Sequence, residues 1–195
     1  MLYSIAEAVH ADLLIKKSRF IACVEPVQDR AAALKIVARL REQHPGAAHV
    51  CWALMAGGQS AAVDDGEPSG TAGRPMLEVL RHQNLEGVLA TVVRYFGGVK
   101  LGAGGLVGAY TDAVAQAVKN AHKIPILKRS VLNCRFAYSL EGLVRREVEQ
   151  AGARFLNVQH DSDVLCAIEV SEAELDQLVL RINDGAQGRV VWLGD

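Results

Sequence analysis

Three carboxylates within four residues form the first group in this sequence that could do chemistry. Asp64, Asp65 and Glu67 lie in a turn-rich run of Asp, Gly, Pro and Ser residues. Carboxylate oxygens are the ligands that Mg²⁺ prefers, so this acidic loop could hold that cation, although its spacing differs from that of a calcium-binding EF-hand. Two other roles are open. The carboxylates could cap backbone N–H groups of the following helix, or one of them could pair with Arg74 or Arg94.

A glycine-rich segment is the second candidate. Residues 87–95 are apolar and β-branched, and Gly102, Gly104 and Gly105 then open an amphipathic stretch. This order of a strand, a glycine loop and the start of a helix is typical of an anion-binding site. Free N–H groups and the positive end of the helix dipole both face the loop. The Walker A motif does not fit, since Lys100 precedes the final glycines and no Ser or Thr follows it. The pattern therefore predicts a site for phosphate or another anion beside Lys100.

The same glycines allow two other interpretations. Gly104, Gly105 and Gly108 could let another element pack close to the helix, or the loop could be catalytic. Arg94, which precedes two aromatic residues, has two roles open as well. It can stack on bases and hold phosphates, or it can be a structural arginine bonded to nearby loop carbonyls.

His49 and Cys51 lie two residues apart, and therefore on one face of a predicted strand. Catalysis by a Cys–His pair needs an ionised thiol and a base within hydrogen-bond reach. No third group that would orient the base is evident, and no established nucleophile motif occurs in the chain. These residues favour a binding protein over an enzyme.

Length and composition place the chain among ordered globular proteins. It has 195 residues, of which 50% are hydrophobic and 22% are charged, which is enough for one large domain or two small ones. The net charge of −1 argues against coating of nucleic acid through bulk charge. However, residues 1–125 hold 13 basic and 11 acidic residues, whereas residues 126–195 hold 8 and 11. A polyanion should therefore prefer the first part.

Neither a signal peptide nor a membrane span is expected. The opening residues lack a basic stretch followed by an apolar run, and no apolar stretch reaches about 18 residues. The four cysteines are far apart and form no C-x-x-C pair, so a zinc site or redox motif is not expected. These features predict buried thiols in a cytoplasmic protein without a resident cofactor. No pattern in the chain indicates an oligomeric state.

A boundary between two domains is predicted where Pro125 follows a long helical pattern. The domains are then residues 1–125 and 126–195. In the second domain the patterns follow the order βαββαβ, which is typical of a ferredoxin-like fold. Ser139 and Ser171 are the expected N-caps of its two helices. The predicted elements are strands at 130–138, 154–160, 164–170 and 189–193 and helices at 140–150 and 171–185.

The first domain mixes helices and strands, so the whole chain is predicted to be α+β. The apolar residues of its last helix recur on one face, as in a helix that packs on a core. The predicted elements are strands at 19–25, 48–55 and 87–95 and helices at 29–43, from residue 75 and at 104–122.

Two blocks of this sequence resemble the signature of the YigZ/IMPACT family. They are residues 64–75, DDGEPSGTAGRP, and residues 92–106, VVRYFGGVKLGAGGL. Residues 17–21 also resemble the N-terminal segment of that family, and the two-domain layout covers nearly the whole chain. The resemblance implies a first domain like the second domain of ribosomal protein S5, which contains a βαβ-type layer. It also implies a ferredoxin-like second domain similar to the last domain of the translocating elongation factor.

For function, the resemblance implies an association with translation. The first hypothesis is a non-enzymatic, translation-associated regulator that contacts RNA, the ribosome or a translation-associated protein. Its expected contacts are Arg74, Arg94, Lys100 and the backbone around Gly102, Gly104 and Gly105. The alternative is a Mg²⁺-dependent enzyme acting on a phosphorylated small molecule or nucleotide, with the cation on the acidic loop. A third hypothesis is a protein adaptor that uses the ferredoxin-like sheet.

Overall fold

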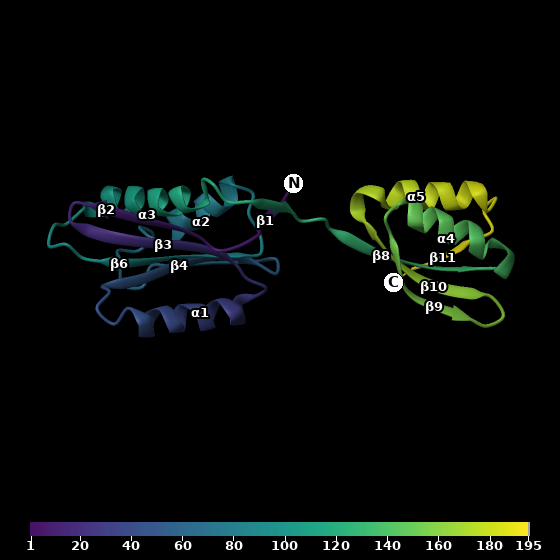
Figure 1. The fold of residues 1–195 in the computed structure, drawn as a ribbon, viewed down its shortest axis with the longest axis horizontal. Helices are drawn as coiled ribbons and strands as arrows, with labels where there is room; N and C mark the ends of the chain where they lie inside the picture. The colour runs from purple at the N-terminus through teal and green to yellow at the C-terminus, as the bar shows by residue number, and fades with distance from the viewer. Residues whose placement is uncertain (195) are drawn as a thin grey trace. The chain divides into compact units, whose positions relative to one another are not determined.

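The structure is a computed structural model that describes residues 1–194, and it shows an α+β protein with two compact units. The first unit is Met1–Ile126 and the second begins at Leu127 (Figure 1). Both units combine a sheet with helices packed on it, so the α+β class predicted from the sequence is confirmed. No helix within residues 1–194 is long and apolar enough to cross a membrane.

The main sheet of the first unit has five strands, namely β2 (Val9–Ile15), β3 (Ser18–Pro26), β4 (His49–Ala56), β5 (Gln59–Val63) and β6 (Val88–Tyr95). Their order in the sheet is β2-β3-β6-β4-β5, and every neighbouring pair is antiparallel. β3 and β4 therefore run in the same direction on either side of β6, and α1 (Arg30–Gln43) connects them. This is a βαβ unit split by an antiparallel strand.

Helices cover both faces of this sheet. α2 (Gly73–His82) and α3 (Gly102–Val118) pack on one face, and α1 packs on the other (Figure 1). Because β6 is covered on both sides, its residues form a nearly continuous apolar run. The predicted apolar face of α3 lies against the sheet, where Leu106 and Tyr110 are buried.

Several elements differ from the sequence prediction. The last helix of the first unit ends at Val118, because the chain beyond it pairs with the N-terminal segment: β7 (Lys123–Pro125) lies antiparallel to β1 (Tyr3–Ile5). The patterns also did not reveal β2 or β5, which are the two edge strands. β5 has one β-branched residue, and the hairpin turn that joins it to β4, at two glycines with positive φ, brings it into the sheet.

The second unit confirms the predicted βαββαβ order. Its elements are β8 (Arg129–Phe136), α4 (Glu141–Gln150), β9 (Arg154–His160), β10 (Val164–Ser171), α5 (Glu172–Gly185) and β11 (Val191–Leu193). The sheet order is β11-β8-β10-β9, and both helices contribute to one core. The prediction of Ser139 as an N-cap is wrong, because Ser139 lies within a short 3₁₀ turn, Tyr138–Leu140, and Leu140 is the residue that precedes α4. Ser171 occupies the predicted N-cap position of α5, but its side chain makes no capping hydrogen bond.

Candidate functional site

A cleft in the first unit brings together residues that are far apart in the sequence. It has a volume of about 380 Å³ and lies between the acidic loop, the end of β6 and the first turn of α3. Four of the predicted site residues line it, namely Glu67, Arg94, Lys100 and Gly102, and His49 and Phe96 complete its polar and aromatic wall. Gly104 and Gly105 lie in the exposed turn that follows Gly102.

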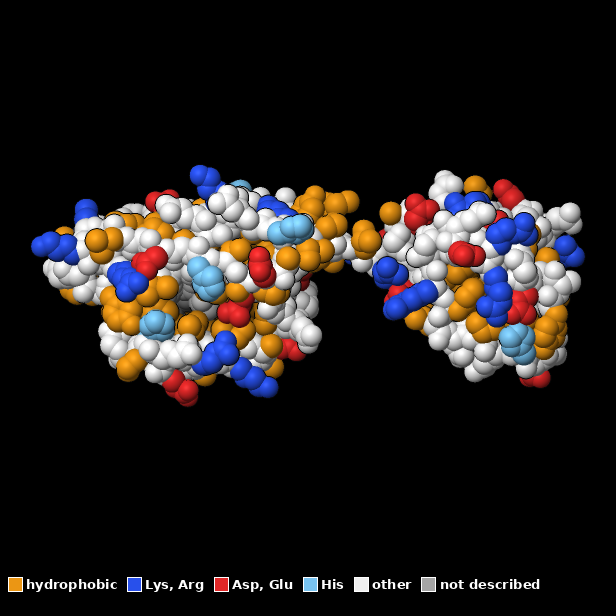
Figure 2. Space-filling model, in the orientation of Figure 1, with side chains coloured by type: hydrophobic (Ala, Val, Ile, Leu, Met, Phe, Trp, Pro, Cys, Tyr) orange, Lys and Arg blue, Asp and Glu red, His pale blue; other side chains and the backbone are white. Residues whose placement is uncertain are grey.

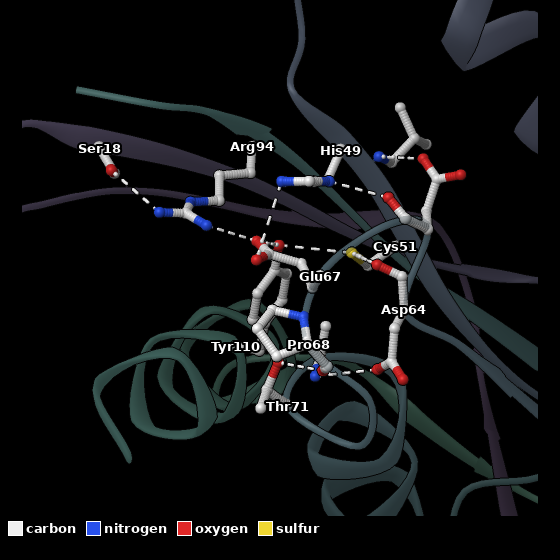
Figure 3. Close-up of polar contacts among 12 residues, drawn as sticks. Ser18, His49, Cys51, Asp64, Glu67, Pro68, Thr71, Arg94 and Tyr110 are labelled. Carbon is white, nitrogen blue, oxygen red and sulfur yellow. Dashed lines mark hydrogen bonds and ion pairs between the residues drawn. The ribbon is translucent and has the colours of Figure 1, made fainter. Parts of the chain in front are cut away.

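A buried ion pair forms the floor of this cleft. The Glu67 and Arg94 side chains are only 3% and 6% exposed, and Nη1 of Arg94 donates to Oε1 of Glu67 at 2.5 Å (Figure 3). The Tyr110 hydroxyl donates to the same oxygen at 2.7 Å, and Nε2 of His49 lies 3.8 Å from Oε2. Glu67 therefore takes the ion-pair role that the sequence left open, and its carboxylate neutralises the charge of Arg94.

The other two carboxylates of the acidic loop accept hydrogen bonds from backbone N–H groups of neighbouring segments. Oδ1 and Oδ2 of Asp64 accept hydrogen bonds from the N–H groups of Gly70, Ala72 and Gly73 at 2.8–3.0 Å, where α2 begins. Asp65 accepts from the Val50 N–H at 2.7 Å and from the Arg41 guanidinium at 2.6 Å. Each carboxylate of the loop thus has partners of its own, and residues 1–194 contain no cluster of His, Cys, Asp and Glu side chains arranged for a metal ion.

The Asp64→Ala variant tests the role of this cap. Burial raises the pKa of the Asp64 carboxyl, but the three backbone N–H groups lower it by more, so the pKa lies below its ordinary value. We expect the variant to lose about 1–2 kcal/mol of unfolding free energy at pH 7. Because the folded-state pKa is lowered, this stabilisation is present above about pH 4 and disappears as the pH falls through the folded-state value.

Urea unfolding of both proteins between pH 7 and pH 2 measures this effect. Asp176→Ala is a suitable control, because it removes the same side chain from an exposed position on α5. A difference between Asp64→Ala and the parent protein that stays constant across this pH range would contradict the role assigned to the ionised carboxylate.

Arg94 also joins β3 to the loop after β6. Its guanidinium lies over the rings of Phe20 and Phe96, at 5.4 and 5.6 Å from their centroids. Nη2 lies 3.5 Å from Oγ of Ser18, and that hydroxyl accepts from the Gly97 N–H at 3.2 Å. Among the residues that the structure describes, Arg94 Nε is a buried donor with no hydrogen-bond partner.

Gly97 lets the β2–β3 turn approach this loop. A Cβ atom at position 97 would lie 2.0 Å from the carbonyl oxygen of Lys17, so the close contact requires glycine. Lys16 and Lys17 form the turn with positive φ and are exposed. In Figure 2, basic side chains lie at the left-hand end of the first unit, where Figure 1 shows this turn near the start of α3. The basic segment thus lies next to the site.

Most glycines of α3 face open space, and the exception is Gly105, where an added Cβ atom would lie 3.1 Å from Cβ of Leu101. A Cβ atom at Gly104 or Gly108 would meet no atom of the described chain within 4 Å, so close packing does not explain these two glycines. Gly102 has a φ of +75°, a conformation that favours glycine. No side chain in the described part of the protein caps the first turn of α3, and that turn carries no acidic residue. Its backbone N–H groups are therefore available to an anion.

Arg74 does not line the cleft. It lies on α2, in a separate groove of about 600 Å³ whose walls include Val79, Val107 and Thr111. The structure therefore separates Arg74 from the other predicted contact residues. Position along the chain could not show this, because it does not tell which groove a side chain of α2 enters.

The His49 and Cys51 side chains support the loop. Nδ1 of His49 is hydrogen bonded to the carbonyl oxygen of Asp65 at 2.8 Å, and Sγ of Cys51 donates to that of Asp64 at 2.9 Å (Figure 3). Burial raises the pKa of the Cys51 thiol to about 12, and the nearby charge of Glu67 contributes to the rise. The thiol is therefore protonated at neutral pH and is not a nucleophile.

Comparisons with known proteins place this site in a family. Residues 16–118 match the model of the Impact N-terminal domain, and residues 134–189 match a domain of unknown function, DUF1949. The chain belongs to the IMPACT family. An IMPACT family member from Haemophilus influenzae is 34% identical over 182 residues, which cover 91% of this chain and 88% of that protein. The family member YigZ from Escherichia coli is 35% identical over 187 residues, which cover 92% and 90%.

A solved structure supports the same conclusion. The crystal structure of a hypothetical protein is 31% identical to this chain, with a TM-score of 0.70, and the match covers 100% of this chain and 97% of that one. Membership of the IMPACT family implies a translation-related regulatory role. Both sequence blocks that resemble the family signature contribute residues to the cleft. The first contributes Glu67 and Pro68, and the second contributes Arg94, Phe96, Lys100, Leu101, Gly102, Ala103 and Leu106.

Proposed function

We propose that this protein is a non-enzymatic, translation-associated binding protein of the cytoplasm that contacts RNA phosphates at the cleft. The uncapped first turn of α3 carries this proposal. Gly104 leaves room that no atom of residues 1–194 fills, although glycine in a helix costs about 0.5–1 kcal/mol relative to alanine. A phosphate that binds the backbone N–H groups from the solvent side would need this space, which explains why glycine occupies the position.

The charges around the cleft support the same proposal. Lys100 is exposed beside the first turn of α3, and Lys16 and Lys17 lie on the turn that packs against Gly97. Arg94 has its charge paired with Glu67, so it holds the floor and does not attract phosphate over a distance. Its unpaired Nε–H is a buried donor of the kind that a bound acceptor satisfies. Lys100 is thus the main charged contact.

The Mg²⁺-dependent enzyme has less support from this geometry. Asp64 is bonded to the start of α2, Asp65 to β4 and α1, and Glu67 to Arg94 and Tyr110. A cation shared by these carboxylates would require breaking several of these bonds. The binding function requires no rearrangement of the acidic loop.

The test is a titration of the protein against fluorescently labelled RNA, followed by anisotropy at several salt concentrations. We expect affinity to fall steeply as salt rises, because bound phosphates release counterions. Lys100→Ala should weaken binding and reduce the slope of log K against log salt by about 1. Lys35→Ala removes the same charge from α1, on the other face of the sheet, and should change neither quantity.

Gly104→Ala gives an independent test, because it removes no charge. Its methyl group should hinder the approach of phosphate to the α3 N–H groups and weaken binding, while the fold remains intact. If Lys100→Ala, Lys35→Ala and the parent protein bind RNA equally tightly, the cleft is not the RNA-binding site. Recovery of a single protein partner after nuclease treatment, with no RNA binding at low salt, would favour the adaptor hypothesis.

A further inference from the structure

The rim of the cleft carries an aromatic ring that the proposed phosphate contacts do not use. Phe96 lines the cleft, and 53% of this residue is exposed. Its ring lies against the Arg94 guanidinium, which also contacts the ring of Phe20. Arg94 is itself held by its ion pair with buried Glu67, so the Phe96 ring lies against a guanidinium whose position is fixed. The exposed part of the ring is thus a preformed flat apolar surface.

Phe96 is close to the features that would hold a phosphate. It lines the same cleft as Lys100, Gly102 and Ala103, so the ring and the first turn of α3 are walls of one cavity. A nucleotide has the matching arrangement, with a flat apolar base next to an anionic phosphate. Proteins that bind single strands combine basic residues with aromatic rings on which bases stack.

We infer that the cleft takes a segment of single-stranded RNA, with one base stacked on Phe96 and the adjacent phosphate on the N–H groups at the start of α3. This inference rests on the proposed function and specifies its ligand. In a duplex each base is stacked between its neighbours and cannot reach a side chain in this way. The volume of about 380 Å³ is at the lower end of small-molecule sites, a size that suits one nucleotide.

The experiment compares three labelled RNAs by fluorescence anisotropy. They are a short oligouridylate, an abasic oligomer with the same number of phosphates, and a blunt duplex of the same length. The parent protein should bind the oligouridylate more tightly than the other two. Phe96→Ala should weaken binding of the oligouridylate by about 5- to 150-fold and leave binding of the abasic oligomer unchanged.

Two further variants separate stacking from apolar contact. Phe96→Leu keeps an apolar side chain but lacks a flat ring, so it should behave like Phe96→Ala. Phe96→Trp should restore or increase the affinity for oligouridylate. The exposed position of Phe96 makes all three variants compatible with folding, which circular dichroism checks.

The possible outcomes distinguish this inference from the proposed function. If the parent protein binds the abasic oligomer or the duplex as tightly as the oligouridylate, the inference that a base stacks on Phe96 is wrong. The proposed binding of phosphate at the cleft is then unaffected. If Phe96→Ala weakens the binding of all three RNAs equally, the residue shapes the loop and does not stack on a base. If no RNA binds at low salt, the proposed function fails and this inference fails with it.

Discussion

Glu67→Ala is expected to lower the free energy of unfolding by about 3–5 kcal/mol, the cost of removing one partner of a buried ion pair. The Arg94 guanidinium, which is buried in the parent protein, would remain charged and would lose its carboxylate partner. The Tyr110 hydroxyl would also lose its acceptor. The loss is large because alanine offers no acceptor to the buried guanidinium and hydroxyl groups that remain. Urea unfolding at neutral pH measures the change, with the slope of the transition as a check on two-state behaviour.

Glu78→Ala is the matched control for this prediction. It removes the same side chain from an exposed pair with Arg81, so it should change the free energy of unfolding by less than about 1 kcal/mol. The double variant Glu67→Leu with Arg94→Met should recover much of the loss, because it removes both charges together. A Glu67→Ala protein as stable as Glu78→Ala would show that the pair does not hold the cleft together.

Gly97→Ala is expected to destabilise the protein by about 3 kcal/mol, at the upper end of the cost of overpacking. The added methyl group would meet the carbonyl oxygen and carbon of Lys17 at 2.0 and 2.1 Å. Both atoms belong to the backbone of a tight turn and cannot rotate away. The β2–β3 turn must then move from the loop, which breaks the bond from the Gly97 N–H to Ser18. Thermal and urea unfolding measure the loss.

Gly108→Ala is the matched control, because it adds the same methyl group at a position where there is room for it. No atom of the described residues lies within 4 Å of its added methyl group, so the variant should gain about 0.5–1 kcal/mol from the better helix propensity of alanine. A Gly97→Ala protein with the stability of Gly108→Ala would contradict the close approach of the β2–β3 turn. Gly97→Ala should also weaken RNA binding, because it displaces Lys16 and Lys17.

The floor of the cleft joins three elements of the first unit. Glu67, Arg94 and Tyr110 come from the acidic loop, β6 and α3, and their hydrogen bonds hold the three elements together. A site held in this way is formed before a ligand arrives, so little ordering of side chains is needed on binding. The exposed groups, Lys100 and Phe96, can then be replaced without loss of the fold.

The sequence by itself determined most elements of the two units. The βαββαβ order of the second unit and the core-facing side of α3 depend on the spacing of apolar residues along a few turns of chain, which a sequence displays directly. Asp29 was likewise predictable as the start of α1, since its carboxylate accepts from an N–H three residues later. The edge strands β2 and β5 were missed, because they form through pairing with neighbours and not through a strong local pattern.

Only the tertiary structure decided the roles within the site. The sequence could not assign a partner to Glu67, whose ion pair with Arg94 spans 27 residues, or link Gly97 to Ser18 across 79 residues. It placed Arg74 with the other basic residues, whereas the fold places it in another groove. Such contacts depend on how strands and helices pack after the chain folds, and not on neighbours in sequence. The open space at Gly104, which supports a ligand rather than packing, is visible only in three dimensions for the same reason.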